Sequence, residues 1–345
     1  MLYLYHMCLE ANDMSKPKLL SAYNKKNNEY YTLYPDIAAE VSRYKDQLKG
    51  KRILCPCDWD ESLNGELVYS DGNYVYPNNL LEQGGTIKKV DLTQPQKIIK
   101  NINIVGCNFV KFLVAHAEDY GIKSIYVSGY NPVTEQGVKF QNIDFSNYDV
   151  VITNPPFSLF REFITTMFDN KMKFLIIGPT TAITYKESFN HIKDNEMWLG
   201  YAKQLSGFKM ADGSYVMSKD KEGSVPRACK WFTNLDVKYR HDRMILTEKY
   251  DPQKYSKYYN YDGIDVSRTI AIPYDYDGIM GVPITFLTKY NPEQFEIIIN
   301  GIGAEKTRRF TGDKSALWTE KDGNPFKEPF ERILIRNKEV YHDED

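Results

Sequence analysis

The chain has 345 residues, of which 42% are hydrophobic, and this is enough for about two domains with sizeable cores. The formal net charge is -2 and the isoelectric point is about 6.3, which excludes a small, strongly basic nucleic-acid binder with a value above about 9. Any contact with nucleic acid must therefore use a locally basic face.

The five cysteines are scattered and odd in number, which argues against a disulfide framework and for a reducing compartment. The first thirteen residues are apolar but include Glu10, and they lack a basic leader and a small-residue cleavage site. No later run approaches the ~18 apolar residues of a membrane span. We therefore expect a cytoplasmic protein without membrane association, with residues 1–26 as an N-terminal extension.

Strand-like and helix-like segments alternate through the first two-thirds of the chain. Helical spacing predicts helices over 36–48 and 108–121, and a third follows Phe157. Strands are predicted at 51–58, in "SIYVSGY", in "YDVVIT" and at 173–179. This alternation predicts an α/β fold whose doubly wound sheet is mainly parallel, with right-handed crossovers.

Two segments depart from that rhythm. Residues 60–105 read as a hairpin or loop inserted after the first strand of the sheet. From about residue 200 the pattern changes to short β-like pieces and tyrosine-rich loops. We therefore expect a catalytic domain over 27–199, with the insertion at about 60–105, and an appended region over 200–345.

The sequence "DVVITNPPF" places Asn154-Pro155-Pro156-Phe157 at the carboxyl end of a buried strand, where ligands collect in parallel sheets. The prolines hold the turn rigid and extended, so carbonyl oxygens project beside the side-chain oxygen of Asn154. We expect Phe157 to add an exposed aromatic face. This arrangement suits a planar group with an exocyclic amine, which Asn154 and the Pro155 carbonyl would bind, while a plain turn is the alternative.

The motif resembles that of adenine-N6 methyltransferases that use S-adenosylmethionine, and other segments narrow the resemblance to the EcoRI type of adenine-specific DNA methyltransferase. These segments are "NNEYYTLYPDI", the glycine-poor "CPCD" loop after the first strand, the pair Asn108-Phe109, and "CKWFTNLD" at 229–236, which has no assigned role. The resemblance covers about 27–58 and 105–240. It implies a Rossmann-like catalytic domain followed by a target-recognition region.

The resemblance also implies cofactor contacts for S-adenosylmethionine. Tyr31 and Thr32 would line its methionine end, with Cys57 and Asp58 contacting it from the first strand. Asp144-Phe145, ten residues before the motif, would hold its purine; a solvated loop aspartate beside a core phenylalanine is the alternative. The Cys-x-Cys pair has no second pair at ligand spacing, so we expect no metal.

Basic residues gather in the last third, interleaved with aromatics. We expect DNA contacts from seven of them: Lys203, Lys209, Arg227, Lys230, Arg240, Arg308 and Arg309. Lysine and arginine contacts to phosphates give affinity, whereas contacts to base edges give sequence choice. Each cluster alone is more often a solvated surface, so this expectation depends on the motif.

The sequence therefore predicts a site-specific DNA adenine-N6 methyltransferase that acts on a flipped adenine in duplex DNA. The same fold acting on RNA adenine or a protein glutamine is one alternative, and a non-catalytic nucleic-acid-binding protein is another, favoured by the glycine-free loop. We expect a monomer. Whether a cognate restriction endonuclease accompanies it is open.

Overall fold

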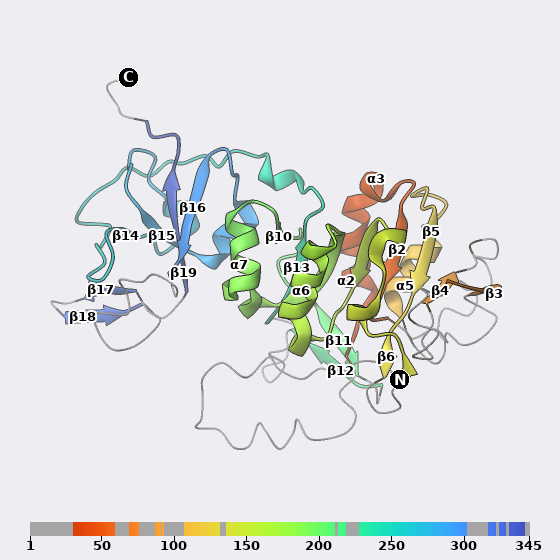
Figure 1. Ribbon diagram of the computed structural model, residues 1–345. Helices are drawn as coiled ribbons and strands as arrows, with labels where there is room; N and C mark the ends of the chain where they lie inside the picture. Colours follow the sequence, from red (N-terminus) through yellow and green to blue (C-terminus); the bar gives the residue numbers. More distant parts are fainter. Residues whose placement is uncertain are drawn as a thin grey trace, which may run out of the picture. The chain divides into compact units, whose positions relative to one another are not determined.

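The computed structural model describes residues 30–58, 69–75, 87–90, 92, 107–131, 136–210, 213–218, 228–301, 317–321, 324–328 and 331–341. The chain divides into two compact units (Figure 1). The first comprises Met1–Glu187 and Leu199–Leu235, and the second comprises Ser188–Trp198 and Asp236–Asp345. The predicted N-terminal extension and most of the predicted insertion at 60–105 lie outside the described residues.

The fold is mixed α/β, built on a large mixed sheet of order β10-β13-β9-β8-β2-β5-β4-β3. In that order its strands are Trp198–Leu199, Cys229–Thr233, Lys173–Pro179, Val150–Thr153, Arg52–Cys55, Ser124–Val127, Ile87–Val90 and Tyr69–Val75. The strands β9, β8, β2 and β5 are parallel neighbours, while β13, β4 and β3 run antiparallel to theirs. All four residues of β8 are buried, as expected for a central parallel strand.

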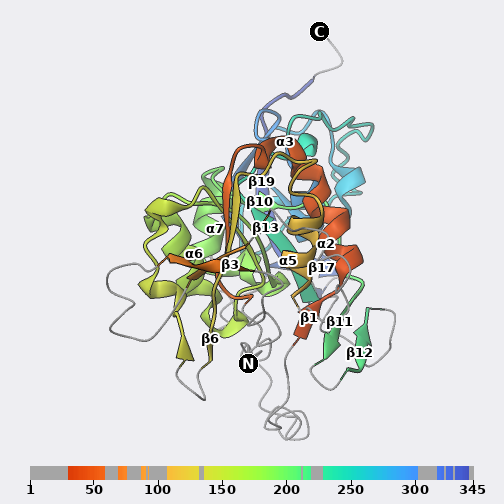
Figure 2. The same ribbon diagram turned by 90° about the vertical axis from the view of Figure 1, so that its right-hand side faces the viewer.

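Helices cover both faces of the parallel strands. Figure 2 shows α6 (Phe160–Asp169) on one face and both α2 (Tyr34–Val41) and α5 (Asn108–Ala115) on the other. Their buried residues recur at helical spacing, as in Phe160, Phe163, Ile164 and Met167 of α6. Among the described residues, the other α-helices are α3 (Lys45–Leu48) and α7 (Lys186–Lys193).

Two of the three predicted helices are shorter than the apolar spacing suggested, whereas α6 agrees with the helix predicted after Phe157. The segment predicted as one helix over 36–48 consists of α2, a 3-10 turn at Ser42–Tyr44, and α3. The helix predicted over 108–121 ends at Ala115, and turns continue to Gly121. Gly121 has φ +61, a left-handed conformation that glycine adopts at little cost, so it ends the turn rather than the helix itself.

A small three-stranded sheet joins β1 (Tyr30–Thr32), β11 (Gly207–Met210) and β12 (Tyr215–Met217). Two acidic side chains of α2 hold the segment that leads into β11. Asp36 accepts hydrogen bonds from the backbone N–H of Ser206, and Glu40 accepts them from those of Tyr201 and Ala202. A short antiparallel pair, β6 (Tyr130–Asn131) and β7 (Gln136–Gly137), also belongs to this unit.

The stretch "CKWFTNLD" contains β13, which pairs with β9 in the large sheet. The hydroxyl of Thr233 donates to the carbonyl of Phe174 at 2.7 Å, and the Asn234 amide bridges the Phe174 N–H and the Met172 carbonyl. This stretch therefore extends the large sheet beyond β9. These pairings also place Leu199–Leu235 in the first unit, although the predicted boundary after residue 199 assigned this segment to the C-terminal region.

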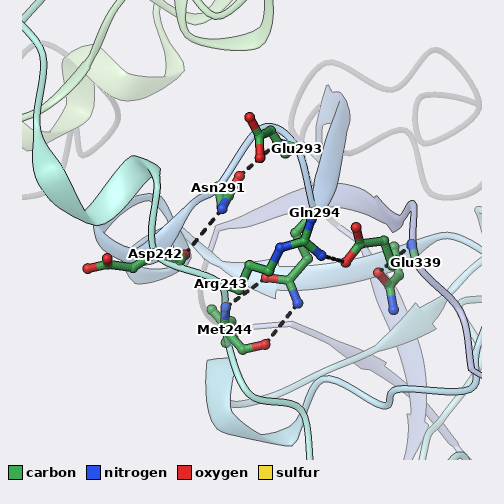
Figure 3. Close-up of polar contacts among 8 residues, drawn as sticks. Asp242, Arg243, Met244, Asn291, Glu293, Gln294 and Glu339 are labelled. Atoms are coloured by element: carbon green, nitrogen blue, oxygen red, sulfur yellow. Dashed lines mark hydrogen bonds and ion pairs between the residues drawn. The ribbon is translucent and has the colours of Figure 1, made fainter.

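The second unit has its own four-stranded sheet of order β14-β15-β19-β16 and a β17-β18 hairpin. These strands are Ile264–Asp265, Met280–Pro283, Arg332–Asn337, Phe295–Asn300, Trp318–Lys321 and Asn324–Lys327, in the same order. Figure 3 shows side-chain hydrogen bonds and an ion pair that connect its loops. The Gln294 amide bonds both the N–H and the carbonyl of Met244, each at 2.8 Å, and Arg243 pairs with Glu339.

None of the helices in the described part of the chain combines the length and the apolar character needed to cross a membrane.

Candidate active site

The Asn-Pro-Pro-Phe motif lies at the carboxyl end of β8, in the middle of the large sheet. Pro156 has an extended conformation and precedes a 3-10 turn at Phe157–Leu159, from which α6 follows at once. The N–H of Leu159 donates to the Pro156 carbonyl at 3.0 Å, which closes this turn. The sequence prediction of a rigid strand-to-helix turn therefore agrees with the structure.

The side-chain oxygen of Asn154 is buried and has no hydrogen-bond partner. Leaving such an atom unpaired costs about 1–3 kcal/mol, and buried polar atoms in native proteins are rarely left so. An unpaired amide oxygen at the carboxyl edge of a parallel sheet is therefore a place where a ligand N–H can bind. Phe157 differs from expectation, because its ring is only 3% exposed. It packs in the turn that it opens, so a ligand reaches its face only after a neighbour moves.

Asp58 connects the loop after β2 to β8. The Thr153 hydroxyl donates to Asp58 Oδ2 at 2.5 Å, and the Asp58 N–H donates to the Ser128 carbonyl at 3.1 Å. Burial raises the pKa of the Asp58 carboxyl to about 7, although hydrogen bonds from Thr153 and Cys107 oppose this. Burial likewise raises the pKa of the Cys57 thiol, which keeps that thiol protonated.

Tyr31-Thr32 is connected to the loop after β2 through the first residues of α5. The Asn108 amide donates to the Thr32 carbonyl at 2.7 Å, and Cys107, which precedes Asn108, hydrogen-bonds Asp58. Thr32 is 4% exposed, and its hydroxyl is buried without a partner. The contacts thus run without a break from Thr32 through Asn108, Cys107 and Asp58 to Thr153 of β8. They connect two predicted cofactor residues, Thr32 and Asp58, and the other two, Tyr31 and Cys57, are their immediate neighbours in the sequence.

The pair Asp144-Phe145 has local partners. Asp144 caps a 3-10 turn, accepting from the N–H of Ser146 at 3.0 Å and from the Asn147 amide at 3.5 Å. Its side chain is exposed, whereas Phe145 is 1% exposed and belongs to the core. These contacts match the alternative of a solvated loop aspartate beside a core phenylalanine. The role of the pair in binding the cofactor remains a prediction.

Two of the seven basic residues expected to contact DNA, Arg240 and Lys230, are engaged within the protein. Arg240 is 7% exposed and lies over the Trp198 ring, 3.6 Å from its centroid. Lys230 is partly buried, which lowers its pKa, and it donates to the Lys203 carbonyl. Lys203 and Lys209 are exposed, and Arg227, Arg308 and Arg309 lie outside the described residues. Arg240 is therefore not available to a phosphate in this structure.

Thr153 is the functional candidate that sequence reasoning missed. It is fully buried and directly precedes Asn154, yet its type alone did not distinguish it from other β-branched strand residues. A hydroxyl at the last position of an otherwise apolar strand was the available signal. Across the described ranges, no cluster of three or more His, Cys, Asp or Glu side chains is arranged to hold a metal ion.

The family model described as "Adenine-specific methyltransferase EcoRI" matches residues 18–67 and 143–338. The chain is 34% identical to the type II methyltransferase M.EcoRI of Escherichia coli, over 96% of this chain and 99% of that protein. It is 30% identical to the type II methyltransferases M.MpnI of Mycoplasma pneumoniae and M.MgeORF184P of Mycoplasma genitalium, over 79% of this chain and 82% and 83% of theirs. No solved structure matched.

The matched range extends to residue 338, well past the end of the resemblance seen in the sequence at about 240. The unmatched segment 68–142 contains most of the predicted insertion at 60–105. The agreement of the family model with a relative of nearly the same length confirms the resemblance based on Asn-Pro-Pro-Phe. The chain therefore belongs to the EcoRI family of adenine-specific methyltransferases.

Proposed function

We propose that this methyltransferase transfers a methyl group from S-adenosylmethionine to the N6 amine of an adenine flipped out of duplex DNA. The single observation that carries the proposal is the buried, unpaired Oδ1 of Asn154 at the carboxyl end of β8. An adenine amine is a donor of the right kind for it, and a second amine hydrogen would bind the Pro155 carbonyl. The names of the relatives, all type II methyltransferases, support a DNA substrate and a restriction-modification role.

The chain's own residues act by orientation and by hydrogen bonding. With both amine hydrogens held by oxygens, the nitrogen lone pair turns out of conjugation with the ring and towards the methyl group. Holding two reactants in line removes much of the entropic barrier, so no strong base is needed, and an Asn suits the site. Stacking of the adenine on Phe157 requires that this buried ring become uncovered when DNA binds.

The residues near β2 fit a cationic cofactor. S-adenosylmethionine supplies an electrophilic methyl group on a sulfonium when bound. Thr32 offers an unpaired hydroxyl, and Asp58 offers a carboxylate that a positive charge would stabilise in its ionised form. We assign the methionine end to Tyr31, Thr32, Cys57 and Asp58, and the purine to Asp144 and Phe145. The parallel strands with helices on both faces support a Rossmann-like fold for this part of the chain.

We also propose that target recognition lies within residues 200–345. The four-stranded sheet of the second unit supports this assignment, since none of the residues proposed for transfer belongs to it. The exposed Lys209 of β11, which pairs with Tyr31 of β1, adds a positive charge in the same range.

The decisive experiment is transfer of labelled methyl from S-adenosylmethionine to unmethylated duplex DNA, followed by digestion to nucleosides. The expected product is labelled N6-methyldeoxyadenosine, and sequencing of the modified positions then gives the recognition site. Label in RNA or in protein, with none in DNA, would replace the DNA substrate by one of those acceptors. Absence of both label and cofactor binding would identify a non-catalytic binding protein.

A further inference from the structure

Arg161 and Tyr185 lie at the edge of the sheet that carries the catalytic motif. Arg161 is in the first turn of α6, seven residues after Asn154. Because β8 and β9 are parallel neighbours, their carboxyl ends meet at one edge. The strand β9 ends at Pro179, and Tyr185 directly follows the 3-10 turn Thr180–Thr184 at that end. Two segments distant in sequence thus supply these side chains.

The guanidinium of Arg161 is held against an aromatic ring. Its Cζ lies 4.3 Å from the centroid of the Tyr185 ring, within the range of a cation–π contact. The Tyr185 hydroxyl lies 3.2 Å from Thr181 Oγ1, a hydrogen bond that fixes the far end of the ring. The ring therefore acts as a platform that orients the guanidinium before any ligand binds.

The Arg161 side chain is also open to solvent and only weakly neutralised. It is 62% exposed, and its ion pair with Glu187 has an N–O separation of 4.0 Å. This is longer than a charge-assisted hydrogen bond of about 2.7–2.9 Å, so the N–H donors of the guanidinium remain able to bind another anion. Arg240 and Arg243, in contrast, are respectively buried over Trp198 and paired with Glu339.

We propose that Arg161, oriented by Tyr185, binds a backbone phosphate beside the target adenine. The inference rests on the proposed function, which requires DNA to approach the edge that carries Asn154. A planar, preoriented fork of donors matches a phosphate in charge and in geometry. A phosphate contact of this kind fixes the register of the duplex over the site and carries no sequence choice.

The salt dependence of DNA binding tests this assignment. Each neutralised phosphate contributes about 0.9 to the slope of log affinity against log salt concentration. Arg161→Gln should therefore make the slope shallower by about 0.9, so that the ratio of wild-type to variant affinity falls about threefold between 50 and 200 mM salt. Tyr185→Leu keeps the charge of Arg161 but removes the aromatic ring that orients it. This variant should bind DNA less tightly at every salt concentration, with little change in the slope.

Lys171 provides the matched control. It is exposed and follows α6 at the opposite end, where the chain enters the amino end of β9. Lys171→Gln removes one positive charge from the same helix–strand unit and should leave the slope unchanged. Binding is measured by fluorescence anisotropy of a labelled duplex, at several salt concentrations, with S-adenosylhomocysteine present. Thermal unfolding and cofactor affinity show that each variant is folded.

Equal slopes for wild type and Arg161→Gln would overturn the assignment, as would an equal loss of slope in Lys171→Gln. If either result is found and the wild-type protein still methylates DNA, the proposed function stands and only the role of Arg161 is overturned. A wild-type protein that neither binds nor methylates DNA overturns both.

Discussion

The hydroxyl of Thr153 donates a 2.5 Å hydrogen bond to the Asp58 carboxylate, and this bond joins the ends of the neighbouring parallel strands β8 and β2. Asn154 directly follows Thr153, so the residue proposed to hold the amine and the loop proposed to hold the cofactor are linked through one side-chain contact. A donor and an acceptor that must be aligned for transfer gain from such a link, because small misplacements slow oriented reactions strongly.

Thr153→Val keeps the shape of this buried side chain and removes its donor. The Asp58 carboxylate then loses a hydrogen bond, so we expect the free energy of unfolding to fall by about 1–3 kcal/mol. Urea denaturation measures this change. Thr153→Ser keeps the hydroxyl and should recover affinity for S-adenosylmethionine that the valine variant loses, as titration calorimetry would show. Equal cofactor affinities for the two variants would contradict the link.

The raised pKa of Asp58 predicts a pH dependence of stability. Burial raises the pKa of this carboxyl from 3.8 to about 7 in the folded protein, while the unfolded chain titrates near the ordinary value. Between these pH values the unfolded state binds fewer protons than the folded state, so the free energy of unfolding falls as pH rises through this window. The full difference is up to about 4 kcal/mol.

Asp58→Asn isolates this contribution, because the amide has nearly the same shape and does not titrate. The variant should lose less stability than wild type between pH 4 and pH 7, and the two curves should run parallel above pH 8. Burial also raises the pKa of Glu40, but that group is common to both proteins and cancels in the difference. Urea midpoints at a series of pH values provide the measurement, and parallel curves throughout would show that Asp58 titrates normally.

Features set by residues close in sequence were predictable from the sequence. The turn at Asn154–Phe157 follows from two prolines after a buried apolar strand, and it has the predicted strand before it and helix after it. Hydrophobic spacing also predicted the order of β2, α5, β5, β8, α6 and β9, but not the strands β1 and β13 of the same unit. The hydrogen bond between Asn108 and Thr32 did not follow from spacing, and the family resemblance assigned a cofactor role to Thr32 but none to Asn108.

Features set by distant partners were not predictable. The sequence gives Arg240 and Arg243 the same charge, but Arg240 is buried over Trp198 and Arg243 pairs with Glu339, which lies 96 positions away (Figure 3). The ring of Phe157 was expected to be exposed because the motif alone does not show what packs on it. The sequence does not show that the Tyr185 ring lies against the Arg161 guanidinium, because the two residues come from different elements.

Glu40 should be the acidic residue of α2 whose loss most destabilises the first unit. It is fully buried and accepts hydrogen bonds from the Tyr44 hydroxyl and from the N–H groups of Tyr201 and Ala202. In Glu40→Gln, the side-chain NH2 group replaces one of the accepting oxygens and faces these hydrogen-bond donors. We therefore expect a loss of about 2–4 kcal/mol in the free energy of unfolding. Asp46→Asn, at an exposed position of α3, is the control and should change it by less than about 0.5 kcal/mol. Equal effects in urea denaturation would show that the buried carboxylate is not needed.

Asn154→Ala should abolish methyl transfer without destabilising the protein. The Asn154 oxygen has no partner to lose, so the free energy of unfolding should change by less than about 1 kcal/mol, and the affinity for S-adenosylmethionine should persist. Loss of a hydrogen bond to a reacting group typically costs about 10²–10³ in rate, and Asn154 also positions the amine, so we expect at least that loss in single-turnover transfer.

Asn154→Asp distinguishes an acceptor role from a purely structural one. The carboxylate keeps an oxygen at the position of Oδ1 and can accept the same amine hydrogen, so this variant should retain part of the transfer rate that the alanine variant loses. If both variants lost activity equally while binding cofactor and DNA normally, the amide N–H rather than the oxygen would be the essential group. Near-normal turnover of Asn154→Ala would remove Asn154 from the reaction and require the amine to be held by backbone carbonyls alone.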